Sequence, residues 1–436
     1  NLLAVTGHNV QREFYVNDAG RQADILAVSA WIRYLLRQGE ELAFPSNGYR
    51  GGYVEGIGAA LEAAQGTQLR RPAAAVLADL PPDAPAGDKD KYIDALIVRM
   101  KALLGDPGFA AVLKLALDAM LADMRADLQE FGVTFDRWYS ERELRESGAI
   151  DRALARLEKQ QLLVRRDGAL WFRATQFGDD EDRVVERANG ERTYFASDIA
   201  YHLDKRERGF ERLIDVLGAD HHGYVARVRG GLVAMGEPGD CLEVCFIQFV
   251  SLYRGAEKIP MGKRDGQFVT LRQLREEVGN DACRFFYLMR SAEQPFDFDL
   301  ELAKSRSNDN PVYYVQYAHA RVASLMRQLK ARALDFDPAA ALTRLHVLDS
   351  PQEQAVLTAL GRYPEVIEQC ATARAPHGLV HYLRELANTF HSWYNASVIL
   401  VDDADLRNAR LALAQGVRQV VRNGLALLGV SAPDSM

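Results

Sequence analysis

The chain has 436 residues, of which 48% are hydrophobic and 26% charged, so it is long enough for two or three domains and too apolar for a disordered or fibrous protein. Its net charge of −7 argues against a protein that coats nucleic acid non-specifically, but local basic faces could still select an RNA. No apolar run reaches the length of a membrane span and no basic-then-apolar leader opens the chain, so we expect a cytoplasmic protein without a membrane partner.

The first residues predict a strand–helix unit of an α/β sheet. Residues 1–7 are typical of a helix end with a glycine stop, residues 10–16 of a strand, and residues 21–38 of an amphipathic helix after a turn at 17–20. A doubly wound sheet would begin with an earlier strand and helix, so we expect its first βα unit to be missing here.

Residues 50–190 are predicted to interrupt this sheet with helical and hairpin insertions. Residues 133–135 predict a short strand and residues 141–159 a helix. The strand-like residues 162–172 turn at Asp167-Gly168, as in a β-hairpin.

Strands and helices alternate again after residue 193, which indicates the second half of a parallel sheet. The expected strands are 193–196, 212–217 and 243–252, with helices from 197 to 208 and over 224–235.

Beyond residue 307 the strands stop, and apolar residues recur at three- and four-residue spacing. We therefore predict an α/β domain over residues 1–306, followed by an all-α bundle over residues 307–436. The expected bundle helices are 311–332, 352–372, 377–395 and 403–428.

Cysteines predict neither a disulfide framework nor a metal site. The four cysteines are few for this length, and the close pair Cys241 and Cys245 lacks a second pair that would complete a zinc site. We therefore expect no bound metal.

The run 257–268 could bind phosphates. Gly262 and Gly266 allow close backbone approach, and Lys263 and Arg264 could neutralise the charge of a departing pyrophosphate. A solvated turn is the ordinary alternative for a basic pair between glycines.

Two further segments place polar residues where a strand meets a helix. Asp220, His221 and His222 could bind ribose hydroxyls and a phosphate, although capping and turn packing are as common for paired histidines. Tyr194 and Asp198 span a predicted strand-to-helix turn, where the carboxylate could hold a guanidinium or ammonium group. The alternative is that Ser197 or Asp198 simply caps the helix.

The first bundle helix carries aromatic residues and a proline near its start. Tyr313, Tyr314 and Tyr317 could stack on unpaired bases, but aromatic residues at helical spacing more often belong to the core.

Taken together, these segments resemble arginyl-tRNA synthetases, which are class I aminoacyl-tRNA synthetases. The resemblance implies a Rossmann-like catalytic domain followed by an anticodon-binding bundle. It implies that ATP is bound as a substrate with Mg²⁺, that no cofactor is tightly bound, and that arginine and its tRNA are the partners. It also implies that the protein is a monomer. It also implies that arginyl-adenylate forms first, typically only with tRNA bound, and that the arginyl group then passes to the tRNA. The segments that carry the resemblance are 12–22, 193–203, 218–224, 277–286 and 310–321.

The resemblance assigns roles to individual residues of this chain. It implies that Lys263 is the catalytic lysine and that three residues receive arginine, namely Tyr194, Asp198 and His221. The residues implied for ATP are Gly218, Asp220, His222, Met261, Gly262 and Lys263, and those for tRNA are Tyr313, Gln316 and Tyr317.

Two departures from the family pattern are visible. The His-x-Gly-His sequence that contacts ATP phosphates is absent, so we expect the N-terminal portion to be lacking and the chain as given not to activate arginine. The Lys-Met-Ser-Lys-Ser loop appears as Pro260-Met-Gly-Lys-Arg264, with only Met261 and Lys263 matching, which leaves the first lysine's role to Lys258, to another basic residue or to none. A non-catalytic tRNA-binding paralogue and a class I ligase for another amino acid are the alternative functions.

Overall fold

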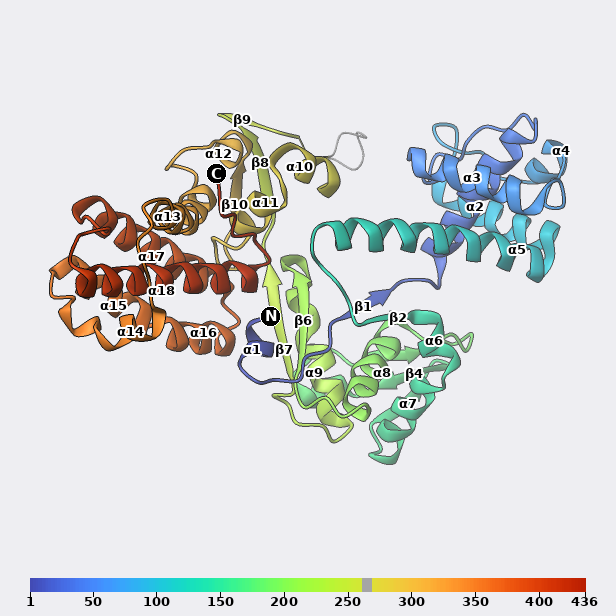
Figure 1. Ribbon diagram of the computed structural model, residues 1–436. Helices are drawn as coiled ribbons and strands as arrows, with labels where there is room; N and C mark the ends of the chain where they lie inside the picture. The colour runs from blue at the N-terminus through green and yellow to red at the C-terminus, as the bar shows by residue number, and fades with distance from the viewer. Residues whose placement is uncertain (261–268) are drawn as a thin grey trace. The chain divides into compact units, whose positions relative to one another are not determined.

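The structure is a computed structural model that describes residues 1–260 and 269–436 (Figure 1). The chain forms two compact units, and their limits differ from the domain boundary predicted after residue 306. That domain boundary stays a prediction. The first unit comprises Asn1–Val10, Phe210–Gly230 and Pro238–Met436, and the second comprises Gln11–Gly209 and Gly231–Glu237. No helix in these described ranges combines the length and apolarity needed to span a bilayer.

The second unit contains a parallel strand pair. The strands β1 (Glu13–Val16) and β2 (Arg137–Ser140) align with Glu13 opposite Arg137. The prediction of a strand at 133–135 is wrong, because the Asp136 carboxylate accepts hydrogen bonds from the backbone and side chain of Arg12 and strand pairing begins only at the next residue.

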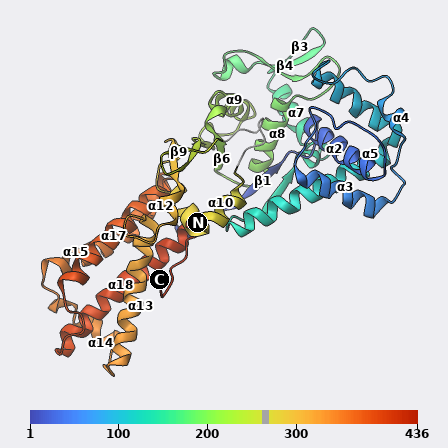
Figure 2. The same cartoon turned by 90° about the horizontal axis from the view of Figure 1, so that it is seen from above.

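A helical insertion lies between these two strands and has its own core. Trp31 and Tyr34 are fully buried, and they donate hydrogen bonds to the carbonyls of Leu69 at 2.9 Å and Gly66 at 2.7 Å. Figure 2 shows α2, α3 and α5 packed together, and α5 is kinked at Gly105. The helices are α2 (Arg21–Arg37), as predicted, α3 (Gly52–Gln65), α4 (Ala73–Leu77) and α5 (Lys89–Glu130).

The rest of the second unit follows β2 and contains short helices and the predicted hairpin. The helix expected over 141–159 is two helices, because Gly148 adopts φ +71° between them. The hairpin turn is confirmed, with φ values of +50° at Asp167 and +78° at Gly168. The elements are α6 (Glu141–Glu146), α7 (Ala149–Lys159), β3 (Leu163–Arg166), β4 (Ala169–Phe172), η1 (Ala174–Phe177), a third strand β5 (Arg183–Glu186), and α8 (Tyr194–Glu207).

The first unit contains a second parallel pair, β6 (Leu213–Gly218) and β7 (Leu242–Ile247). The single strand expected over 243–252 is wrong, since the Gln248 amide donates to the Ala292 carbonyl and the chain then enters another sheet. The other elements are α1 (Leu2–Val5), η2 (Ala219–Tyr224), α9 (Val225–Ala234), which ends in the second unit, β8 (Val250–Arg254), β9 (Glu257–Lys258), α10 (Leu271–Val278), α11 (Asn280–Tyr287), β10 (Phe296–Asp299) and α12 (Leu300–Lys304).

The predicted helical bundle ends the chain, and Figure 1 shows α13, α17 and α18 lying side by side. Phe390 and Trp393 are fully buried in it. The helix expected over 352–372 is two helices, because Pro364 supplies no amide hydrogen and fits only the first turn of a new helix. The elements are α13 (Pro311–Ala331), α14 (Pro338–Thr343), η3 (Leu345–Val347), α15 (Pro351–Gly361), α16 (Tyr363–Thr372), α17 (Pro376–Ala396) and α18 (Ala404–Leu428).

Candidate functional site

The helix α8 carries the two residues expected to recognise arginine. Thr193 caps this helix, since its hydroxyl accepts a hydrogen bond from the Ala196 amide at 3.3 Å. The predicted strand at 193–196 and a cap at Ser197 or Asp198 are therefore wrong. Because Tyr194 and Asp198 are both helical and four residues apart, they lie on one face of α8.

The end of β1 lies beside this helix face. A Cβ atom added to Gly20 would be 3.7 Å from the Tyr194 hydroxyl, so the turn after β1 approaches the start of α8. Burial raises the pKa of Tyr15, and the negative charges of Glu141 and Asp198 raise it further, which places the Asp198 carboxylate near the Tyr15 phenol. A carboxylate that shares a helix face with a tyrosine suits a planar cation such as guanidinium.

Contacts further along α8 fix its orientation on β1. Tyr201 donates a hydrogen bond to Glu13 at 2.7 Å, and Arg208 pairs with the same carboxylate at 2.8 Å. The ring of Tyr201 packs against the rings of Tyr15 and Tyr139, with centroids 4.8 and 4.7 Å apart. This network holds the start of α8 in register with the end of β1.

Three of the residues expected to bind ATP, Gly218, Asp220 and His222, lie in the first unit, where β6 leads into η2. A Cβ atom at Gly218 would come within 2.6 Å of an Asp220 carboxylate oxygen, so any larger residue would displace that carboxylate. His222 stacks on Phe246 with ring centroids 3.7 Å apart, and Asp220, His221 and His222 are all exposed. The Asp220 carboxylate and both imidazoles can therefore reach a ligand.

The phosphate loop falls largely outside the described residues. Met261, Gly262 and Lys263 lie there, and so do the neighbouring Arg264 and Gly266. Within the described ranges no cluster of three or more His, Cys, Asp or Glu side chains could hold a metal ion.

The aromatic residues of α13 form a continuous surface with α17. The rings of Tyr313 and Tyr317 stack with centroids 6.2 Å apart, and Tyr317 also stacks on His391 at 5.5 Å. The Arg321 guanidinium lies 5.2 Å from the centre of the Tyr317 ring. These half-buried tyrosines keep part of each ring accessible.

Gln316 has a different environment from these tyrosines. Its side chain is buried, and its amide nitrogen donates to the Asp281 carboxylate at 2.8 Å and to the Ser431 carbonyl at 2.9 Å. This placement favours a role in joining α13 to α11 and to the C-terminal segment.

The sequence assigned no role to Tyr15 or Gly20. Both lie within residues 12–22, a segment quoted for the family resemblance, so the resemblance was the available signal. Their proximity to Tyr194 and Asp198 appears only once β1 and α8 are folded together.

Comparisons with known proteins identify the family of this chain. Residues 95–289 match the model of the class I (R) tRNA synthetase catalytic domain, and residues 315–436 match the DALR anticodon binding domain. The arginine–tRNA ligases of Thioalkalivibrio sulfidiphilus and Halorhodospira halophila are 57% and 54% identical over 100% of this chain, which spans 75% and 74% of their lengths.

Solved structures show the same fold. A Campylobacter jejuni structure assigned as an arginyl-tRNA synthetase gives a TM-score of 0.83 at 26% identity, covering 100% of this chain and 87% of its own. The Thermus thermophilus arginyl-tRNA synthetase gives 0.72 at 22% identity, covering 100% of this chain and 77% of its own, and supports the fold alone. The polar face of α8, the two domain matches and the full-chain identities together show that this chain belongs to the arginine–tRNA ligases, a family of class I aminoacyl-tRNA synthetases.

Proposed function

We propose that the protein joins L-arginine to its tRNA at the expense of ATP. The arginine carboxylate attacks the α-phosphate, pyrophosphate leaves, and the arginyl group of the adenylate then passes to a terminal ribose hydroxyl of the tRNA with release of AMP. No covalent bond to the enzyme forms, so the protein acts by positioning groups and stabilising charge.

The placement of Tyr194 and Asp198 on one face of α8, beside the turn at Gly20, is the observation that carries this proposal. A bidentate contact from guanidinium to Asp198 would satisfy both carboxylate oxygens, and lysine or citrulline would each lose part of it. Tyr194 is 63% exposed, so its hydroxyl and ring are accessible to a substrate. His221 is assigned to the same substrate, as a neighbouring polar group.

ATP enters as its Mg²⁺ complex, and we assign its ribose side to Gly218, Asp220 and His222. The close approach of the Asp220 carboxylate to Gly218 supports this assignment, because a glycine there leaves the carboxylate free to turn toward ribose hydroxyls. Met261 and Gly262 would approach the phosphates through their backbone, and Lys263 would neutralise charge on the departing pyrophosphate.

The tRNA would contact the aromatic surface of α13, with Tyr313 and Tyr317 stacking on unpaired bases. Gln316 would support that surface from within. We infer that the enzyme works as a monomer, and in the cytoplasm because its tRNA substrate is used there.

Exchange of labelled pyrophosphate into ATP tests the proposal. It is followed with a panel of amino acids, with tRNA present, and with protein that carries an N-terminal portion containing the His-x-Gly-His sequence. Arginine alone should support exchange, and the same preparation should charge arginine tRNA. Exchange with lysine or another amino acid would contradict the arginine assignment. Binding of tRNA without exchange for any amino acid would instead indicate the non-catalytic paralogue.

A further inference from the structure

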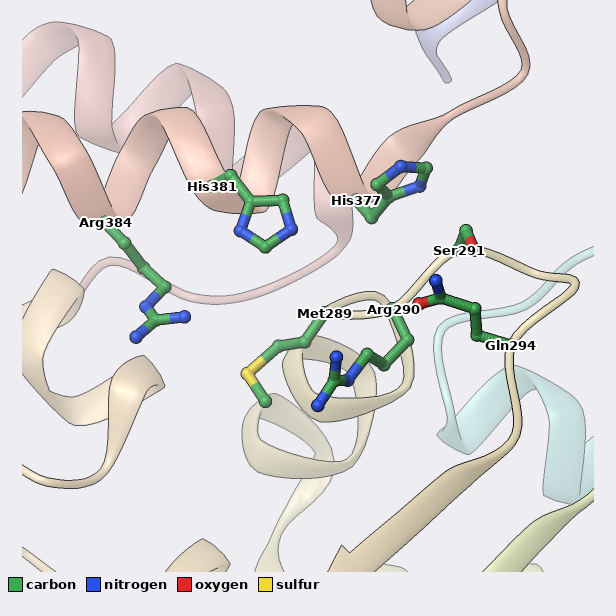
Figure 3. A pocket seen from close by; sticks show the side chains of 7 residues that line it. All are labelled: Met289, Arg290, Ser291, Gln294, His377, His381 and Arg384. Atoms are coloured by element: carbon green, nitrogen blue, oxygen red, sulfur yellow. The ribbon is translucent and has the colours of Figure 1, made fainter.

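A pocket between α17 and the loop after α11 gathers positive charge and lies apart from the residues assigned above (Figure 3). Its volume is about 390 Å³. His377, His381 and Arg384 line it from α17, and Arg290, Ser291 and Gln294 line it from the loop. All of these residues belong to the first unit.

The charges in this pocket lack compensation. Neither Arg290 nor Arg384 has a hydrogen bond or ion pair among the described residues, and no acid lines the pocket. The neighbouring acid Glu385 is already paired, since it accepts from Arg362 at 2.8 Å. By contrast, several other bundle arginines pair with a carboxylate, namely Arg344, Arg362, Arg374, Arg410 and Arg418.

The cations also lie close enough to act on one another. The rings of His377 and His381 have centroids 6.1 Å apart. Burial lowers the pKa of His381, and the charges of His377, Arg384 and Arg290 lower it further. An anion placed among these four groups would relieve this repulsion, and phosphate fits best because guanidinium groups bind its oxygens in pairs while hydroxyl and amide groups complete the contacts.

The position of the pocket indicates which phosphate it serves. Met289, which also lines it, is the last residue of the catalytic-domain match, whereas α17 lies within the anticodon-domain match. A tRNA that reaches both domains must cross their junction. We propose that Arg290 and Arg384, with His377 and His381 beside them, bind a backbone phosphate of the tRNA, an inference that rests on the proposed tRNA-charging function.

The test measures tRNA affinity at several salt concentrations for Arg290→Gln and Arg384→Gln. Each substitution should weaken binding of an arginine tRNA transcript by roughly three- to tenfold, and should reduce the slope of log affinity against log salt by about 1. With saturating tRNA, kcat should stay unchanged. Arg384→Lys keeps the charge and should recover most of the salt slope.

Arg187→Gln provides the matched control, because Arg187 is an exposed arginine that pairs with Glu191 in the second unit. It removes the same charge and should leave the salt slope at the wild-type value. Thermal unfolding of each variant verifies that the fold is intact.

Three outcomes would overturn the proposal. If Arg290→Gln and Arg384→Gln both keep the wild-type tRNA affinity and salt slope, the pocket does not contact the tRNA. An equal loss of tRNA affinity in the Arg187→Gln control would lead to the same conclusion. Inorganic phosphate or pyrophosphate binding that is lost in the variants, with tRNA affinity unchanged, would assign the pocket to a free phosphate. Failure to charge arginine tRNA by wild-type protein that carries an N-terminal portion with the His-x-Gly-His sequence would refute the proposed function, and charging is measured separately from tRNA affinity.

Discussion

The contact between α8 and α9 allows a sharp test of how packing supports the arginine site. Gly231 lies inside α9, and a Cβ atom there would be 2.6 Å from Cγ2 of Ile199, which is fully buried next to Asp198. That separation is too short for two carbon atoms, and a β-branched side chain turns away only with difficulty. Gly231→Ala should therefore push the two helices apart.

The expected change in the free energy of unfolding of Gly231→Ala follows from two opposing effects. Overpacking a core costs about 1–3 kcal/mol. Replacing glycine by alanine inside a helix recovers up to about 1 kcal/mol. The free energy of unfolding of the second unit should therefore fall by about 1 kcal/mol, and by up to about 2 kcal/mol if the helices cannot relax. The KM for arginine should rise as well, because α8 carries Tyr194 and Asp198.

Urea unfolding followed by tryptophan fluorescence measures this loss, since Trp31, Trp138 and Trp171 all belong to the second unit. Gly56→Ala in α3 is the control, because a Cβ atom there meets nothing within 4 Å and should stabilise by about 0.5–1 kcal/mol.

A double-mutant cycle decides the mechanism. Ile199→Ala removes the 2.6 Å contact, so Gly231→Ala made in that background should become neutral or stabilising, with a coupling of about 2 kcal/mol. Equal effects of Gly231→Ala in both backgrounds would refute the packing argument.

Three further predictions concern charged groups. Asp198→Asn should raise the KM for arginine roughly 10- to 100-fold, because a hydrogen bond to a charged group contributes about 1.5–3 kcal/mol; an unchanged KM in steady-state arginylation would exclude Asp198 as the guanidinium partner. Glu353→Ala should destabilise the first unit by about 3 kcal/mol in urea unfolding, because Glu353 is buried and accepts a hydrogen bond from Arg410 at 2.7 Å. Adding Arg410→Met should restore most of this loss, because it removes the charge left unpaired. A loss below about 0.5 kcal/mol in Glu353→Ala alone would contradict this reasoning. Burial lowers the pKa of His391 to about 4, so between pH 6.5 and 4 only the unfolded chain binds this proton. The free energy of unfolding should therefore decrease by up to about 3 kcal/mol as the pH is lowered through this range. His391→Asn should flatten this part of the pH profile, and an unaltered profile would argue against a buried neutral imidazole.

Local chemistry explains which elements could be predicted from the sequence. The helix over 21–37, the hairpin at Asp167-Gly168 and the bundle follow from apolar spacing and turn residues that act within a few positions of one another. Errors occurred where a single residue decided the outcome. Thr193 begins α8 in place of the expected strand, and Pro364 divides a predicted helix.

The sequence by itself determined the family, the α/β and all-α halves, and the residue types expected to bind arginine, because ordered motifs and helical spacing are written along the chain. Only the tertiary structure decided that Gly20 lies beside Tyr194, that Gln316 is buried, and that Arg290 lines one pocket together with residues of α17. These facts depend on contacts between residues far apart in the chain. Such contacts are set by how helices and strands pack, and no local pattern encodes them.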